Sequence, residues 1–238
     1  MPFTFSHPAI VLPLARTKLC LTGLIAGSLT PDFEYFFRMK IQSDFSHSYL
    51  GGIYFGLPIG LLICFVFHQM IKNKLIQNLP RRFQLKFGPI LKFNWLEQFK
   101  RNWLIVILSV LLGTYSHIFW DSFTHQNAYF VNVLNLNEPF GNTNYPMFKI
   151  LQHSSTVLGG LYILYYISRM EDIYETTTKP DLTYWSIFVL LTCSILAIRI
   201  YTGLNISQYG NVIVSGISAS MIALVLVSII VKDKKATT

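Results

Sequence analysis

Five of the six histidines and two aspartates are of the right type to bind a divalent metal together. The candidate ligands are His7, Asp32, His47, His117, Asp121, His125 and His153. Imidazole and carboxylate groups are common ligands of zinc and related divalent ions. His117 and Asp121 are four residues apart, so both side chains would lie on one face of a helix. The sixth histidine, His68, is expected to have a structural role.

Long apolar runs must position these residues. Of the 238 residues, 52% are hydrophobic and only 13% are charged, whereas a soluble domain has about a quarter charged residues. Because a helix crosses a bilayer with about 20 apolar residues, five runs are predicted to span: Tyr49–Ile71, Trp103–Trp120, Thr156–Ser168 (with its flanking residues), Tyr184–Ile200 and Val212–Val231. The runs lack the alternation of a barrel. We therefore expect an all-α, polytopic membrane protein with about five transmembrane helices, forming a single integral membrane domain over residues 1–238.

The first 48 residues predict a helical hairpin rather than two full crossings. A short helix is expected over His7–Ala15 and a longer one over Thr17–Phe37, interrupted near Pro31 and Asp32. The distance in sequence between His7 and Asp32 is too small for two spans. The hairpin could dip into the membrane from the outer face or lie in the interface.

The distribution of charged residues predicts how the chain is oriented in the membrane. The segment Lys72–Arg101 contains eight Lys and Arg residues and one acid, Glu97. Basic loops between spans stay in the cytoplasm, so we expect a multi-pass protein of the cell (inner) membrane with Asp121–His153 outside. A basic loop on anionic lipid headgroups explains this segment better than nucleic-acid binding, and no nucleic-acid partner is expected. The seven candidate ligands then gather at the extracytoplasmic face.

Helix polarity favours a metal together with an anion at that face. The outer end of Trp103–Trp120 would be a helix C-terminus, whose partial negative charge attracts cations. The helices that follow His47 and His153 would begin there, and the N–H groups of a helix start attract anions. A metal that holds an anionic group such as phosphate fits both conditions.

Several motifs resemble known families. The opening Met1-Pro2-Phe3-Thr4-Phe5-Ser6-His7-Pro8-Ala9, with residues 27–35 and 46–48, resembles an uncharacterised bacterial family of small integral membrane proteins. That family in turn resembles the membrane-bound metal-dependent hydrolases. Their motifs Gly-x-x-x-Pro-Asp, His-Ser and His-x3-Asp correspond here to Gly27–Asp32, His47-Ser48 and His117–Asp121.

More distantly, the ligand order is similar to that of zinc-dependent phospholipase C and related single-strand nucleases. This resemblance implies one metal held by four residues that match in order: Asp32, His47, His117 and Asp121. It implies a second metal at His7, although no processed N-terminal Trp precedes it, and a third at His125 and His153, although Val157 replaces the expected Glu. One to three divalent ions, with zinc the expected metal, are therefore implied.

Together these features predict a membrane-embedded, metal-dependent hydrolase of a lipid or other membrane-borne phosphoester. A water molecule activated by the metal would attack the ester, and Asp32 is the candidate catalytic carboxylate. A transporter or metal-handling protein could use the same residues, but no pair of broken helices at mid-membrane is evident. A scaffold that binds metal only structurally is a third possibility.

Overall fold

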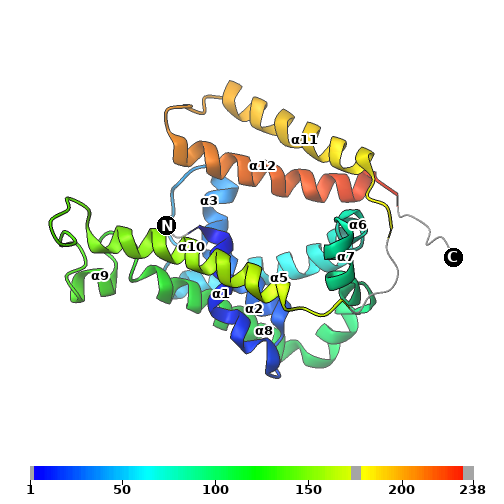
Figure 1. The fold of residues 1–238 in the computed structure, drawn as a ribbon, viewed down its shortest axis with the longest axis horizontal. Helices are drawn as coiled ribbons and strands as arrows, with labels where there is room; N and C mark the ends of the chain where they lie inside the picture. Colours follow the sequence, from blue (N-terminus) through cyan, green and yellow to red (C-terminus); the bar gives the residue numbers. More distant parts are fainter. Residues whose placement is uncertain (1–2, 173–177, 233–238) are drawn as a thin grey trace. The chain divides into compact units, whose positions relative to one another are not determined.

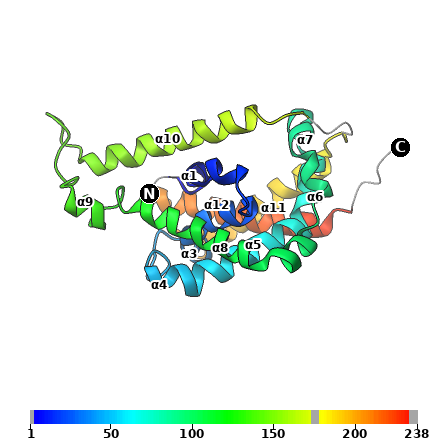
Figure 2. The same ribbon diagram turned by 90° about the horizontal axis from the view of Figure 1, so that it is seen from below.

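The computed structural model describes residues 3–172 and 178–232. These residues form helices and turns with no strand among them, which confirms the all-α class (Figures 1 and 2). They divide into two compact units. Unit 1 comprises Met1–Phe33, Asp44–Leu62 and Arg101–Arg169, and unit 2 comprises Glu34–Ser43, Ile63–Lys100 and Met170–Thr238. The single domain expected over residues 1–238 stays a prediction.

Four helices in the described residues are long and apolar enough to cross a membrane. They are Tyr49–Asn78, α8 (Trp95–Asp121), α11 (Leu182–Tyr201) and α12 (Tyr209–Ile230). The fifth predicted span is helical too, as α10 (Met147–Ser168), but it is not among these four. Its first half contains the polar residues Lys149, Gln152 and His153, so that only its second half is continuously apolar.

The segment predicted as a basic loop is largely helical. The helix that starts at Tyr49 runs as α4 (Tyr49–Gly51), π-helical η4 (Gly52–Gly56), α5 (Leu57–Val66), π-helical η5 (Phe67–Ile71) and α6 (Lys72–Asn78). After it come α7 (Arg81–Phe87) and a 3-10 turn, η6 (Gly88–Lys92). α8 then begins at Trp95 and kinks at Asn102, whose φ of −131° and ψ of 32° are not helical. The predicted start at Trp103 therefore coincides with the kink.

The N-terminal region forms more and shorter helices than the two predicted. These are η1 (Thr4–Ser6), α1 (Pro8–Val11), η2 (Leu12–Arg16), α2 (Leu21–Leu29) and η3 (Thr30–Asp32), with α3 (Phe33–Arg38) after them. Pro8, Pro13 and Pro31 each lie at the start of one of these pieces. Proline lacks the N–H that would continue the preceding helix, which explains the breaks.

Backbone contact between α2 and α8 organises unit 1. A Cβ atom on Gly27 would lie 2.0 Å from the carbonyl oxygen of Val110, and one on Gly113 would lie 2.2 Å from that of Leu24. Both positions therefore require glycine, because any side chain would push the two backbones apart. Leu24 and Val110 are fully buried. This contact holds the C-terminal end of α2, and the Asp32 turn after it, against the second half of α8.

The helix α10 packs against the N-terminal turn of the same unit. The backbone N–H of Phe3 donates to Thr156 Oγ1 at 2.9 Å, and Ser6 Oγ donates to the carbonyl oxygen of Thr156 at 2.9 Å. Gly159 lies under η1, where a Cβ atom would be 2.9 Å from the carbonyl oxygen of Ser6. The short helix α9 (Tyr129–Val133) lies between α8 and α10 in the sequence.

Unit 2 is built on α11 and α12, which run side by side in opposite directions (Figures 1 and 2). α11 begins where the Asp181 carboxylate accepts from the Thr183 N–H at 2.9 Å. Several small residues of α12 are buried, among them Ala219 and Ala223. His68 is buried and stacks on Trp95 with ring centres 4.9 Å apart, in agreement with a structural role.

Candidate metal centre

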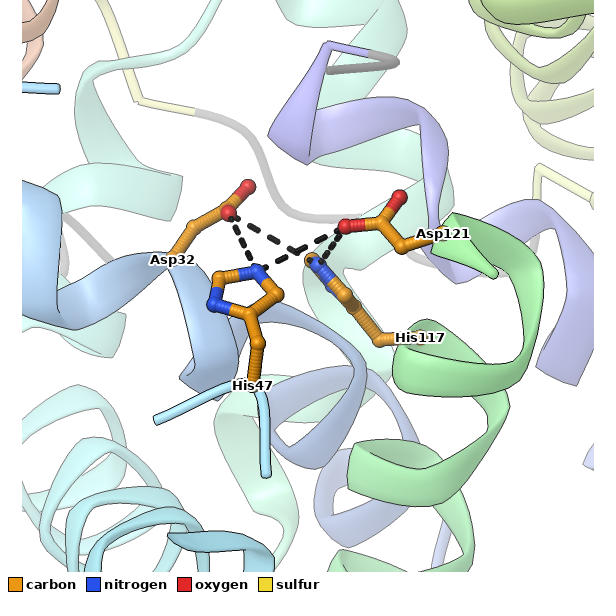
Figure 3. A group of neighbouring side chains, drawn as sticks. All are labelled: Asp32, His47, His117 and Asp121. Atoms are coloured by element: carbon orange, nitrogen blue, oxygen red, sulfur yellow. Dashed lines mark hydrogen bonds and ion pairs between the residues drawn. The ribbon is translucent and has the colours of Figure 1, made fainter. Parts of the chain in front are cut away.

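Three segments of unit 1 bring four of the predicted ligands together (Figure 3). Asp32 ends η3, His47 lies just before α4, and His117 and Asp121 lie one turn apart at the end of α8. The side chain of Ser48 begins α4 by accepting from the Gly51 N–H at 2.9 Å, which sets the position of the residue before it. His47 is half-buried, and the other three ligands are buried.

The spacing of the ligand atoms suits a single metal ion. One oxygen or nitrogen atom from each of the four residues lies within 4.8 Å of the others. His47 Nε2 is 3.4 Å from Asp32 Oδ1 and 3.5 Å from Asp121 Oδ2. His117 Nε2 is 3.6 Å and 3.1 Å from the same two oxygens. Ligand atoms with metal bonds of about 2.0–2.1 Å in tetrahedral geometry are about 3.3–3.4 Å apart, so these distances fit a metal between the four groups.

Hydrogen bonds fix which nitrogen each imidazole presents to the centre. His117 Nδ1 is 2.7 Å from the carbonyl oxygen of Ser28, which can only accept, so Nδ1 carries the proton. Ser46 Oγ donates to the carbonyl oxygen of Pro31 at 2.7 Å and lies 3.1 Å from His47 Nδ1. Because its one proton is already used, Ser46 accepts from His47. In the neutral form that a metal binds, both imidazoles would therefore direct an unprotonated Nε2 toward the centre.

In each of the two carboxylates, likewise, one oxygen contacts a neighbouring side chain and the other is directed toward the centre. Asp32 Oδ2 accepts from the Thr4 hydroxyl at 2.5 Å, whereas its buried Oδ1 accepts no hydrogen bond from the described residues. Asp121 Oδ1 lies 3.1 Å from His7 Nε2, and its Oδ2 faces the centre. Each of the four ligands thus points one atom inward and is held by a partner at another atom. Metal sites typically show this arrangement, because outer partners orient the ligands.

Without a metal, these contacts favour protonated imidazoles beside ionised carboxylates. Burial by itself would lower the pKa of His47, but its contacts with Asp121 and Asp32 raise the pKa to about 9. Burial opposes ionisation of Asp32, yet the imidazoles of His117 and His47 hold the pKa of its carboxyl below the usual value. The site therefore pairs anionic carboxylates with a cation, either protons on the imidazoles or a metal that replaces them.

His7 and His125 adjoin the four ligands, and His153 does not. The ring of His7 stacks on that of His117, with centres 3.6 Å apart and planes 9° apart. His125 Nδ1 lies 3.2 Å from the carbonyl oxygen of Asp121. Burial lowers the pKa of both His7 and His125, which favours the neutral form that a metal needs. His153 lies on an exposed part of α10. The roles of these three as ligands of further ions stay predictions.

Sequence reasoning did not identify the residues that hold the ligands. Thr4 and Ser46 lie within the motifs already quoted, close in sequence to His7 and His47, so their proximity to the site could have been noticed. The carbonyl group of Ser28 has no sequence signal, because every residue has one. Thr124 also approaches the site, with its Oγ1 at 3.5 Å from Asp121 Oδ1.

The fold and the site define an all-helical protein with membrane-type helices and a buried His/Asp cluster able to hold a metal ion. The chain belongs to the family described as Domain of unknown function (DUF4184), whose family model matches residues 1–229. This result agrees with the predicted membership of an uncharacterised family. Searches of curated proteins and of solved structures gave no significant match. The likeness to hydrolases and the ligand order of zinc-dependent phospholipase C therefore enter below as parts of a proposal.

Proposed function

We propose that this protein is a membrane-embedded, metal-dependent hydrolase of a lipid or other membrane-borne phosphoester. The observation that carries the proposal is the set of one ligand atom from each of Asp32, His47, His117 and Asp121, all within 4.8 Å of one another. When bound, such a metal makes water more acidic and stabilises charge on a phosphoryl oxygen. Zinc is the expected metal, with one to three ions.

Asp32 is the candidate catalytic residue in this proposal. Thr4 occupies one carboxylate oxygen, Oδ2, and leaves the other free of hydrogen bonds from the described residues. The free oxygen can bind the metal, and the carboxylate can orient a water molecule and take up its proton. His7, which adjoins the site through Asp121 and whose lowered pKa favours the neutral imidazole, would be a further metal ligand in this proposal.

The position of the site along α8 supports a membrane-borne substrate. α8 is one of the four apolar helices, and two of the ligands occupy its last turn. The end of a span lies at the boundary between hydrocarbon and headgroups, the depth at which lipid phosphoesters are found. As part of the same proposal, we place the protein in the cell membrane with this boundary at the extracytoplasmic face and the basic residues near anionic headgroups inside.

The number of protein ligands favours one alternative, a metal with a structural role only. Zinc with four protein ligands in a tetrahedron has no open position, and such sites are structural. An ion with five or six positions would leave room for water and substrate beside the same four groups. A transporter would instead need polar groups through the membrane, and these ligands gather at the end of one span.

Paired substitutions test hydrolysis. Asp32→Asn keeps the shape of the side chain but removes the base and weakens the metal ligand. We expect turnover of phospholipids or simple phosphodiesters by purified, metal-loaded protein to fall by about two orders of magnitude or more. Asp44→Asn is the matched control, because Asp44 is exposed and lies outside the four-residue cluster; its turnover should equal wild type.

Two results would overturn the proposal. Metal-loaded wild-type protein that hydrolyses none of a broad panel of lipid phosphoesters would leave the structural-metal alternative. Metal-dependent ion or proton flux in liposomes that Asp32→Asn abolishes would favour a transporter instead.

A further inference from the structure

A large apolar cleft opens beside the candidate metal centre, within unit 1. Its volume is about 860 Å³, in the upper part of the range of about 300–1,000 Å³ that is usual for small-molecule sites. α1, α8 and α10 contribute most of its lining. The apolar part is formed chiefly by Ile10, Phe119, Trp120, Phe123, Leu151 and Leu158.

The polar end of the cleft reaches the metal ligands. His7 and Thr124 line the cleft, and both also approach Asp121 Oδ1, at 3.1 Å and 3.5 Å respectively. A ligand in the cleft could therefore place a polar group next to the centre while the rest of it contacts apolar side chains. The mechanism proposed above makes no use of this cleft.

The apolar lining lies at the end of a membrane-type helix. Phe119 and Trp120 belong to the last turn of α8 and are 52% and 37% exposed. Aromatic rings in this position are typical of the membrane interface, where one side of a molecule is apolar and the other is hydrated. A molecule that fits here has an anionic head for the metal end and a hydrocarbon tail for the apolar end.

We propose that the cleft binds an acyl chain of the substrate, so that the substrate class is a phosphoester with a long hydrocarbon chain. This inference rests on the proposed hydrolase function. The charge of a bound metal suits the phosphate, and the apolar lining, which is continuous with the site through His7, suits the chain. Hydrolysis should then depend on chain length even for substrates that are not in a membrane.

A series of soluble alkyl phosphodiesters, from butyl to octyl and each kept below its micelle-forming concentration, tests the inference. Burial of each CH2 group contributes about fourfold in affinity, so kcat/KM should rise by up to about fourfold per added methylene. The same kcat/KM for butyl and octyl substrates, with hydrolysis of both, would overturn the inference and leave the hydrolase intact. Absence of any hydrolysis would count against the proposed function itself.

Two matched substitutions on α10 test whether the hydrocarbon chain of the substrate binds in this cleft. Leu158 lines the cleft and is 65% exposed, whereas Leu164 is 62% exposed and is not among the lining residues. Leu158→Trp should lower kcat/KM for the octyl substrate by about tenfold, the loss of nearly two buried methylenes, and leave the butyl substrate unchanged. Leu164→Trp should change neither. An equal effect of the two substitutions, or none from either, would place the chain elsewhere.

Cross-linking gives a readout that needs no turnover. A photoreactive alkylphosphocholine should label Leu158 or other lining residues on α1, α8 and α10 in purified Asp32→Asn protein, and excess unlabelled alkylphosphocholine should compete. Labelling confined to other helices, or labelling without competition, would contradict the proposed chain site whether or not the protein is an enzyme.

Discussion

At the scale of single residues, Thr4 is the clearest test of how the candidate ligands are held. Its buried hydroxyl donates to Asp32 Oδ2. Loss of an outer partner typically costs about 10–100-fold in metal affinity. We therefore expect Thr4→Val to weaken metal binding by that factor, measured by competition with a chelator.

The conservative variant Thr4→Ser distinguishes positioning from packing. Serine keeps the hydroxyl and loses the methyl group, so it should recover most of the metal affinity even if it lowers thermal stability slightly. Equal affinities for Thr4→Val and wild type would show that the hydrogen bond does not orient Asp32.

The pKa of His47 makes a second prediction, on pH. Contacts with Asp121 and Asp32 raise the pKa of His47 to about 9 in the metal-free protein, so the imidazole is protonated at neutral pH. A metal binds the deprotonated imidazole and must displace this proton. Apparent metal affinity should then increase with pH, by about tenfold per pH unit for one displaced proton, and level off above about pH 9.

Titration calorimetry in buffers of different ionisation enthalpy measures the protons released. Release of no proton at neutral pH would contradict the raised pKa of His47. The same titration of His47→Gln, which cannot hold the proton, should show weaker binding with less proton release.

The four central residues could be predicted from the sequence because their types and spacing are specific. His117 and Asp121 share a helix face, and Asp32 and His47 lie in quoted motifs, so their convergence was expected. The order of ligands did not predict that His153 lies on an exposed part of α10. Nor could it show the role of Thr4, because a hydroxyl near a histidine in sequence has many possible partners.

At the scale of helices, two glycines set the distance between α2 and α8. Gly113→Ala would place a methyl group 2.2 Å from the carbonyl oxygen of Leu24, and backbone cannot move aside as a flexible side chain can. Overpacking of this kind typically costs about 1–3 kcal/mol. We expect a lower thermal midpoint in detergent and weaker metal binding, because the separation moves Asp32 away from His117.

Gly216→Ala in α12 is the matched control. A Cβ atom there meets nothing within 4 Å among the described residues, and alanine is the better helix former. Thermal stability should stay the same or rise, and metal affinity should not change. If Gly113→Ala behaved like Gly216→Ala, close packing of α2 on α8 would not be what positions the site.

Helix positions were predicted best where apolar runs are long. α11 and α12 begin and end within a few residues of the predicted runs, since about 20 apolar residues leave few alternatives. The segment after Ile71 was predicted as a loop because of its charge, yet α6 and α7 are helical. Lysine and arginine are good helix formers, so charge marks a position relative to the membrane rather than a loop.

At the scale of the whole molecule, orientation is the prediction that decides where the candidate substrate would come from. Basic residues precede α8, and Asp121 ends it. The bias of basic segments toward the cytoplasm predicts that the candidate metal centre lies on the opposite, extracytoplasmic side. An inverted chain would give the same centre access to lipids and phosphoesters of the cytoplasmic leaflet instead.

Cysteine labelling in intact cells tests this orientation. The three native cysteines, Cys20, Cys64 and Cys193, are first replaced by serine or alanine. Asn142 and Arg82 are both exposed, which makes them suitable for single cysteines on the two predicted sides. Asn142→Cys should react with an impermeant thiol reagent, and Arg82→Cys should react only after the membrane is permeabilised, because a thiol must be reachable to be modified. The reverse pattern would place the metal centre inside the cell, since the segment from Asp121 to Asn142 contains no apolar run long enough to cross the bilayer.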